Sequence, residues 1–502
     1  MKLHTVRVYP SSTTLAKESQ LAWKLAEVAT HEVAVEIEVA RMVANRMIDN
    51  AAVALAALNR GPVCHARAQA IAHPREDGAR LFGIENNRTF DAEWAAWANG
   101  VAVRELDMHD TFLAADYSHP ADNIPPLLAV AQQCGCTGAK LLRGIVAAYE
   151  IQIALVKGIC LHKHKKDHIA HLCPAQAGGI GAMLGLSTDI VYQAIQQAVH
   201  VSFTTRQSRK GEISSWKAFA PAHAGKLAIE SIDRAMRGER SPSPIYEGED
   251  SVLAYMLDGQ QAEYLVPLPG AGEPRRAILE SYTKEHSAEY QSQALIDLAF
   301  QVRTKIADLH EIKKITIHTS HHTHFVIGTG SGDPQKFDPN STRETLDHSI
   351  MYIFAVALED GHWHHINSYT PERAQRTETV ALWRKIETTE DPVWTERYHE
   401  PDPARRAFGG RVVIELKDGE LLEDELAVAN AHPSGKSPFA RPDYIRKFDT
   451  LTEGLVATAE RDRFLGLCDR LSELSVGEVA QLNIQFVKDA VQGTERDTKG
   501  IF

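Results

Sequence analysis

Cysteine is scarce in this sequence, and its arrangement excludes two classes of protein. The 502 residues contain six cysteines, scattered between positions 64 and 468, and the one close pair is Cys134 and Cys136. This pair has CxC rather than CxxC spacing, and no second pair completes the four thiolates of a zinc or iron–sulfur site. The sequence therefore predicts neither a disulfide scaffold nor aconitase-like chemistry on an iron–sulfur cluster.

Excess positive charge and long apolar runs are also lacking. Lys and Arg number 54 against 66 Asp and Glu, a formal net charge of −12, which argues against nucleic acid as the main partner. No stretch approaches the roughly 18 consecutive apolar residues of a membrane helix. The first residues contain no apolar signal-peptide core and are not rich in arginine. We therefore expect a cytoplasmic protein whose partners include neither nucleic acid nor membrane.

The apolar periodicity predicts helices over most of the first 270 residues. Val33–Leu58 and Leu141–Val156 carry apolar residues at three- and four-residue spacing. Ala175–Val199 is rich in Ala and Gly, so we expect one central helix there, buried on nearly all sides.

The pattern changes after Pro267–Pro274, which we interpret as a hinge. Lys314–Thr319 alternates like a strand, and Arg411–Ala429 predicts a hairpin around Asp418-Gly419. The helices expected after the hinge are Gln291–Leu309, Ser341–Leu358, Thr370–Ile386, Tyr444–Thr458 and Ala459–Leu474. The predicted fold is mainly α, with a large all-helical domain (1–270), a smaller inserted α+β lid domain (271–435) and a C-terminal helical segment (436–502) that returns to the large domain.

A polar stretch at residues 105–120 combines carboxylates with imidazoles. Asp107, His109, Asp110, Thr111 and His119 fall within a short predicted loop. A loop of this composition can supply a general base together with the group that orients it. The alternative is a helix cap at Asp110 and Thr111 followed by a solvated loop.

Histidines are concentrated at residues 162–171. His164 and His168 are four residues apart, and His168 and His171 are three apart, the spacing of two metal ligands on one helix face. An HExxH motif is absent, and no carboxylate is placed as a third ligand. We therefore favour a basic surface, or a wall that faces an anion, over a metal site.

Positive charge is concentrated at residues 204–217, although the whole protein is acidic. Arg206, Arg209, Lys210 and Lys217 are interleaved with hydroxyl residues. Guanidinium forks and hydroxyls at this density suit a small molecule with several carboxylates, and an ordinary charged loop is the alternative. A fourth polar stretch, residues 281–293, lies at the start of a predicted helix.

Two further patterns carry no predicted chemistry. The histidines that follow the predicted strand are expected on the surface, because strand alternation splits them between faces; they are His318, His321, His322 and His324. The glycines of residues 178–181 and 328–332 lack GxGxxG spacing, and the sequence has neither a P-loop nor a GxSxG motif. Dinucleotide binding, nucleotide-driven chemistry and α/β-hydrolase chemistry are therefore not predicted.

Several of these segments together resemble one enzyme family. They are Leu106-Asp107, Asp110-Thr111, His119-Pro120, Asp167-His168, Leu184–Leu186, Ser215–Ala218 and Ser287–Gln293. In them the sequence is similar to the 2-methylcitrate dehydratase family, which also contains cis-aconitate decarboxylase, and the similarity covers nearly the whole chain. The resemblance implies a large helical domain, a smaller lid, a cleft between them, a homodimer, and catalysis without metal or organic cofactor.

The resemblance also implies roles for individual residues. The implied catalytic residues are Asp107, His119, His168, Lys217 and Lys284, with His171 as the alternative to His168. The residues expected to bind substrate are Thr111 and Glu289 from the resemblance, and Arg206, Arg209 and Lys210 from the charge pattern. The decarboxylase branch carries a histidine where Glu289 stands, which favours a dehydratase.

The chemistry of dehydration agrees with these residues. A base must remove a proton from the carbon beside a carboxylate, cations must stabilise the charge that develops, and the leaving hydroxide needs a proton. The expected function is metal-free conversion of 2-methylcitrate into 2-methyl-cis-aconitate in propionate catabolism. The alternatives are another tricarboxylate lyase (a citrate or isocitrate dehydratase, or cis-aconitate decarboxylase) and a non-catalytic carboxylate-binding or scaffold protein.

Overall fold

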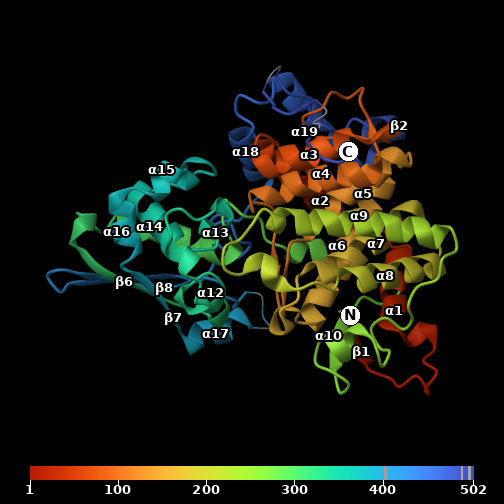
Figure 1. Cartoon of the computed structure of the whole chain (residues 1–502), viewed down its shortest axis with the longest axis horizontal. Coiled ribbons are helices and arrows are strands. Elements are labelled where there is room, and N and C mark those ends of the chain that lie inside the picture. The colour runs from red at the N-terminus through yellow and green to blue at the C-terminus, as the bar shows by residue number, and fades with distance from the viewer. Residues whose placement is uncertain (401, 403, 488–489, 496–498) are drawn as a thin grey trace.

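A computed structural model shows the chain as two bodies, each with its own hydrophobic core (Figure 1). The structure describes residues 1–400, 402, 404–487, 490–495 and 499–502. The larger core draws its buried residues from 6–278 and again from 444–484. The smaller core draws its residues from 288–414. The chain is mainly α, as predicted.

The large body consists chiefly of helices. Its helices are α1 (Leu21–Thr30), α2 (Ile37–Ala57), α3 (Gly61–Ile71), α4 (Ala92–Glu105), α5 (Ile124–Gln133), α6 (Gly138–Gly158), α7 (Ile169–Leu184), α8 (Thr188–Ser202), α9 (Trp216–Met236) and α10 (Val252–Met256). It is not all-helical, which corrects the prediction. Its strands are β1 (Lys2–Arg7), β2 (Pro74–Ala79), β3 (Phe112–Leu113), β4 (Tyr117–Ser118) and β5 (Glu263–Leu268), with β1 paired to β5 and β3 to β4.

The Ala- and Gly-rich centre of the large body is two helices rather than the single one expected. Gly185 ends α7 in the left-handed conformation, with φ at 70°, and α8 begins at Thr188 under a Ser187 cap. Helices α6 and α7 pack closely because Gly144 and Gly179 face each other, and an added Cβ on either would lie within 3 Å of the opposite helix. Gly179 inside α7 therefore serves helix packing, whereas Gly185 supplies the break between α7 and α8.

The small body is a four-stranded sheet with helices. Its strands are β6 (Ile312–Thr319), β7 (Ile386–Glu390), β8 (Gly410–Leu416) and β9 (Leu421–Leu426), in the order β7-β6-β8-β9. Its helices are α11 (Gln293–Arg303), α12 (His321–Val326), α13 (Arg343–Leu346), α14 (Ile350–Asp360), α15 (Pro371–Ala374), α16 (Thr377–Trp383) and α17 (Pro392–Tyr398). Strands β6 and β7 are parallel, and the other pairs are antiparallel. The hairpin predicted around Asp418-Gly419 is confirmed, with Gly419 at a φ of 92°.

Two of the predicted helices in the small body are wrong in extent. The expected helix Ser341–Leu358 is broken, because Ser349 caps a new helix and leaves residues 347–349 outside both α13 and α14. The expected helix Thr370–Ile386 is two short helices followed by β7, whose β-branched sequence suits a strand. The first break matters for function, because it turns Asp347 toward the large body.

The C-terminal part returns to the large body. Helices α18 (Arg441–Leu451), α19 (Thr458–Asp469) and α20 (Val476–Val479) follow the small body, and both α18 and α19 contact α2. In Figure 1 these blue helices lie beside the red and orange N-terminal helices. Within the described residues, no helix combines the length and apolarity required to cross a membrane.

Candidate active site

The site is built on the loop that follows α4. Helix α4 ends at Glu105, and Asp107 takes the left-handed conformation with φ at 50°, which turns the chain sharply. Asp110 anchors the rest of this loop, since its carboxylate accepts hydrogen bonds from the Ala121 amide at 2.8 Å and the Tyr149 hydroxyl at 2.9 Å. Asp110 is therefore a fully buried support of the loop rather than a solvated helix cap.

The Asp107 carboxylate is surrounded by three cations. Oδ1 lies 2.5 Å from an Arg104 guanidinium nitrogen and 2.5 Å from Lys284 Nζ, and Oδ2 lies 2.9 Å from Lys217 Nζ. Burial alone would raise the pKa of Asp107, but these cations hold it well below its ordinary value. Asp107 is thus an ionised carboxylate, and it fixes the positions of both lysines.

The small body contributes a second carboxylate to this cluster. Both oxygens of Asp347 lie 2.8 Å from Lys217 Nζ, and Oδ2 also accepts from Arg343 at 3.0 Å. His348 Nδ1 lies 2.5 Å from Asp347 Oδ1. Lys217 therefore joins Asp107 of the large body to Asp347 of the small body, with all three side chains almost completely buried.

His119 is arranged as a neutral base. Its Nδ1 lies 3.0 Å from the Asp110 carbonyl oxygen and 3.1 Å from the Thr111 hydroxyl. A carbonyl only accepts, so Nδ1–H is the donor and Nε2 keeps its lone pair. Burial lowers the pKa of His119 well below its usual value, and the charges of Arg104 and Lys284 lower it further. His119 is therefore unprotonated at neutral pH and ready to accept a proton.

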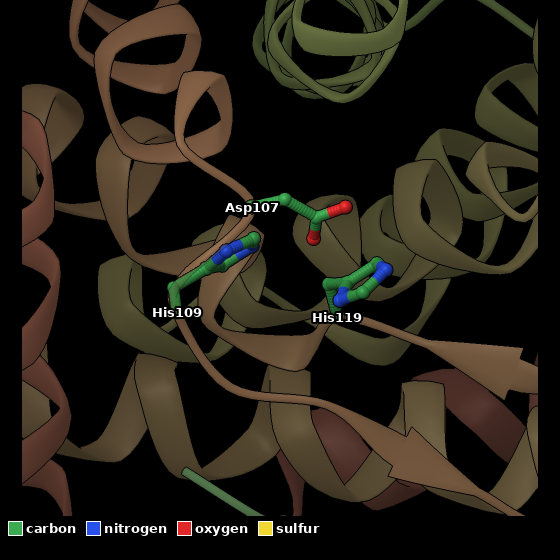
Figure 2. Close-up of side chains that lie close together, drawn as sticks. All are labelled: Asp107, His109 and His119. Atoms are coloured by element: carbon green, nitrogen blue, oxygen red, sulfur yellow. The ribbon is translucent and has the colours of Figure 1, made fainter. Parts of the chain in front are cut away.

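Asp107, His109 and His119 lie together (Figure 2). One donor atom from each lies within 4.8 Å of the others, and the two imidazole rings are 5.2 Å apart between centroids. Behind them, His109 Nε2 lies 2.9 Å from Asp122 Oδ1, a buried carboxylate that sequence reasoning did not single out. His109 Nε2 is therefore bound to a carboxylate, whereas the hydrogen bonds of His119 involve Nδ1 and leave its Nε2 available.

His168 and His171, the two candidates for the second active-site histidine, lie at different distances from His119. His168 Nδ1 lies 2.8 Å from Asp167 Oδ1, and its ring centroid is 5.5 Å from that of His119. His171 lies one turn farther along, with Nε2 held 2.9 Å from the Ile159 carbonyl oxygen. The structure therefore brings His168, and not His171, beside the predicted base.

The other residues expected to bind substrate are placed at different depths. Thr111 contacts His119, and Arg209 reaches both Asp167 and His168 at 3.3 Å. Arg206 donates to the Tyr117 hydroxyl at 2.9 Å, one layer farther out. Lys210 is half exposed and pairs with Asp333 of the small body at 2.6 Å, so it lies at the rim and not in the buried cluster.

Glu289 faces the cluster from the segment before α11. Burial raises its pKa to about 7, against the lowering effect of the nearby Lys284 charge. Its Oε2 accepts from the Gln291 amide at 2.7 Å, and its backbone N–H donates to the Asp347 carbonyl at 3.2 Å. A carboxyl group with this pKa is partly protonated at neutral pH, so it can donate a proton as well as accept a hydrogen bond.

The C-terminal segment supports the site through Lys447 of α18, which contacts the backbone of the site loops. Lys447 of α18 is buried and pairs with Asp49 at 2.6 Å. The same ammonium donates to the carbonyls of Met108 at 2.7 Å and Lys284 at 2.8 Å. One side chain of the returning segment therefore ties together the backbones that carry Asp107 and Lys284.

The charge balance of the cluster favours an anion over a metal ion. The cations Arg104, Lys217, Lys284 and Arg343 outnumber the carboxylates Asp107 and Asp347, which leaves an excess of two positive charges when Glu289 is protonated and of one when it is ionised. Two sets of side chains have ligand atoms close enough for a metal; they are Asp107, His109 and His119, and Asp107, Asp347 and His348. Asp107 belongs to both sets, and the three cations on it oppose a divalent ion at that position.

Sequence reasoning missed six residues of this arrangement: Arg104, Asp122, Arg343, Asp347, His348 and Lys447. Arg104 carried a signal, since it is three residues before Asp107, a spacing at which two charges can pair on one helical turn. Asp347 and His348 were hidden inside a helix predicted to be continuous. Nothing local in their sequence indicates that they reach the other body.

Comparisons with known proteins identify relatives of this chain. The family model for the MmgE/PrpD N-terminal domain matches residues 19–265, and the MmgE/PrpD C-terminal domain matches residues 286–472. The 2-methylcitrate dehydratase of Salmonella typhimurium is 26% identical over 423 residues, which cover 81% of this chain and 85% of that protein. The 2-methylcitrate dehydratase of Cupriavidus necator is 27% identical over 366 residues, 70% of this chain and 72% of that protein. A mitochondrial 2-methylcitrate dehydratase of Yarrowia lipolytica is 28% identical over 341 residues, 65% of this chain and 63% of that protein.

Proposed function

The chain belongs to the MmgE/PrpD family, and we propose that it is a 2-methylcitrate dehydratase, a hydro-lyase that forms 2-methyl-cis-aconitate in propionate catabolism. One observation carries the proposal beyond the likeness to named relatives. A neutral imidazole, His119, lies beside a buried cluster with an excess of positive charge. This is the combination that removal of a proton next to a carboxylate requires.

In the proposed mechanism His119 Nε2 takes the proton from the carbon that carries the methyl group and a carboxylate. The electron pair of that C–H bond forms the C=C bond, and the C–O bond of the neighbouring hydroxyl breaks. Lys217 and Lys284 stabilise the negative charge that develops on the carboxylate. Every step uses side chains of this protein, with no metal or organic cofactor.

The leaving hydroxide needs a proton, and we assign its donor as Glu289. Its pKa of about 7 keeps a fraction of this carboxyl protonated at neutral pH. Hydroxide then departs as water, and the proton taken by His119 returns to solvent.

The small body acts as a lid in this proposal, with residues 271–435 moving as one unit on the large body. Asp107, Lys217, Lys284 and Asp347 each expose at most 1% of their surface, so a substrate reaches them only after the bodies separate. The chain crosses between the bodies twice, near residues 270–285 and 430–441, which suits hinge motion. Crystal structures with and without the non-reactive analogue tricarballylate test this, and identical orientations of the two bodies would reject the lid.

We further propose a cytoplasmic homodimer, as the family resemblance implies. Light scattering at micromolar concentration should give twice the chain mass of 55.5 kDa. Cell fractionation with an antibody to the native protein tests the compartment, and recovery in mitochondria, where one relative is named, would reject the cytoplasm.

The activity itself is tested by incubating the purified protein with 2-methylcitrate and recording the ultraviolet absorbance of the conjugated alkene. Citrate, isocitrate and cis-aconitate serve as competing substrates in parallel assays. Turnover of 2-methylcitrate in preference to the other three is the expected result. Loss of carbon dioxide from cis-aconitate as the fastest reaction would reject the dehydratase assignment, and no turnover of any of the four would reject a tricarboxylate lyase.

A further inference from the structure

A second basic cavity lies outside the buried cluster, at the boundary between the two bodies. Its volume is about 790 Å³. Residues 162, 164–166, 205–207, 209 and 210 of the large body line one side, and residues 321, 325, 326, 330, 331 and 333 of the small body line the other. We refer to this cavity as the vestibule.

The charge of the vestibule is strongly one-sided. Five of its lining residues are Lys or Arg, and Asp333 is the one lining carboxylate. Arg209 is paired with Asp167, and Lys210 with Asp333. The other three cations are Lys165, Lys166 and Arg206, and they form no ion pair with any residue that the structure describes.

The unpaired cations are held on a fixed backbone. The Arg206 amide donates to the Lys165 carbonyl at 2.8 Å, and the Asp167 amide donates to the Thr204 carbonyl at 3.0 Å. Lys166 and Thr205 form an antiparallel bridge between these two bonds. Backbone hydrogen bonds therefore join two basic segments that are about 40 residues apart in sequence, and side chains of both segments line the same cavity.

The vestibule lies next to the proposed catalytic groups, separated from them by side chains that line it. Arg209 lines it and lies 3.3 Å from His168, whose ring is next to that of His119. Arg206 also lines it and bonds to Tyr117, which precedes His119 by two residues on β4. Among the described residues, one layer of side chains separates the cavity from the predicted base.

We propose that the vestibule is a separate binding site for a tricarboxylate, in which the substrate is held before the small body opens the buried cluster. Three unpaired cations match three carboxylates in number. Lys165 is exposed and Lys166 and Arg206 are half-buried, so the anion can reach all three while the lid is closed. The wall is formed by both bodies, so lid movement can transfer the bound anion inward. This inference rests on the proposed function for the identity of the anion, but its binding test does not require turnover.

The test is a calorimetric titration with tricarballylate, which lacks the hydroxyl group that leaves. The wild type should bind two molecules per chain. Replacing both Lys165 and Lys166 by Ala should weaken one of the two sites about 25-fold, or roughly 5-fold for each charge removed, and leave the other site unchanged. Lys217→Ala should weaken the other site instead.

Lys163→Ala is the matched control. Lys163 is an exposed lysine of the same segment, pairs with Asp258 and does not line the vestibule, so both affinities should stay unchanged. A single site per chain, or two sites that the Lys165/Lys166 double variant leaves intact, would overturn the inference. Failure of the proposed function would appear differently, as absence of 2-methylcitrate turnover whatever the number of binding sites.

Discussion

The positive charges of the buried cluster and those of the vestibule differ in burial and in ion pairing. Inside the cluster, Lys217 and Lys284 are buried, and each has a carboxylate within 3 Å. In the vestibule, Lys165 is exposed and Lys166 is half-buried, and neither has an ion-pair partner among the described residues. Burying a charge without a partner costs several kcal/mol, whereas water solvates an exposed one at little cost. The buried cations can therefore act only through a fixed network, and those of the vestibule remain free to capture an anion.

The largest effect is expected on kcat, when the proposed general base His119 is removed from the buried cluster. His119→Ala should lower kcat by about 10²- to 10⁴-fold, because general acid–base catalysis is lost. Affinity for tricarballylate should change little, since other residues hold the carboxylates. Steady-state kinetics with 2-methylcitrate measure this, and His171→Ala is the matched control for loss of a buried imidazole. Near-native kcat in His119→Ala would exclude the proposed role.

The next largest effect is expected on the free energy of unfolding, when Asp347, the carboxylate partner of the buried cations, loses its charge. Asp347→Asn removes the charge that Lys217 and Arg343 share, and a broken buried pair should lower the free energy of unfolding by about 3 to 5 kcal/mol. Urea denaturation measures this. Glu230→Gln, in an exposed pair with Arg234, should cost at most about 0.5 kcal/mol. Equal losses in the two variants would show that burial does not set the strength of these pairs.

The lysines themselves should affect binding and catalysis together. Lys217→Ala and Lys284→Ala remove a cation that contacts both the bound carboxylate and its more charged transition state, so KM should rise and kcat should fall. A decrease in kcat of about 10²-fold is expected for each, as for other groups that stabilise developing negative charge. Melting temperatures separate this from unfolding. A rise in KM with unchanged kcat would confine the lysine to binding.

A smaller effect is expected from pH. Glu289 must be protonated to act as the acid, and its raised pKa is about 7, so kcat should fall as pH rises through 7. The base His119 has a lowered pKa, so the loss of rate at acid pH should lie well below pH 6.5. Rates between about pH 5 and 9 record both limbs. Glu289→Gln should abolish the alkaline limb along with most of the activity, and its persistence in the variant would assign that limb to another group.

The smallest effect is expected from salt, which should weaken binding at the vestibule while leaving the buried cluster unaffected. Raising the ionic strength from about 0.05 to 0.5 M screens exposed charges but hardly affects buried pairs. KM should therefore rise severalfold while kcat stays constant. A proportional loss of kcat would mean that salt reaches the buried cluster.

Much of the fold followed from local pattern. The helices of the large body, strand β6 and the hairpin around Gly419 were predicted because apolar periodicity and turn residues act over a few positions. Two of the errors occurred where single residues interrupt a pattern, at Gly185 and at Ser349. Surface positions were predicted for four histidines, but His322 is on α12 and not at a strand end, and its ring lies 5.2 Å from that of His162 in the other body.

The sequence by itself determined the chemistry that is available: a His/Asp loop, cleft lysines and an acidic chain with a local excess of positive charge. Residue types and their spacing carry that information, and Asp107, His119, Lys217 and Lys284 do lie together. Tertiary structure alone decided how the charges are paired. Asp347 reaches Lys217 across 130 positions of sequence, and Lys447 reaches Lys284 across 163, because folding brings the small body and the returning C-terminal segment to one buried point. At that point each charge requires a partner, and no local pattern specifies which one it finds.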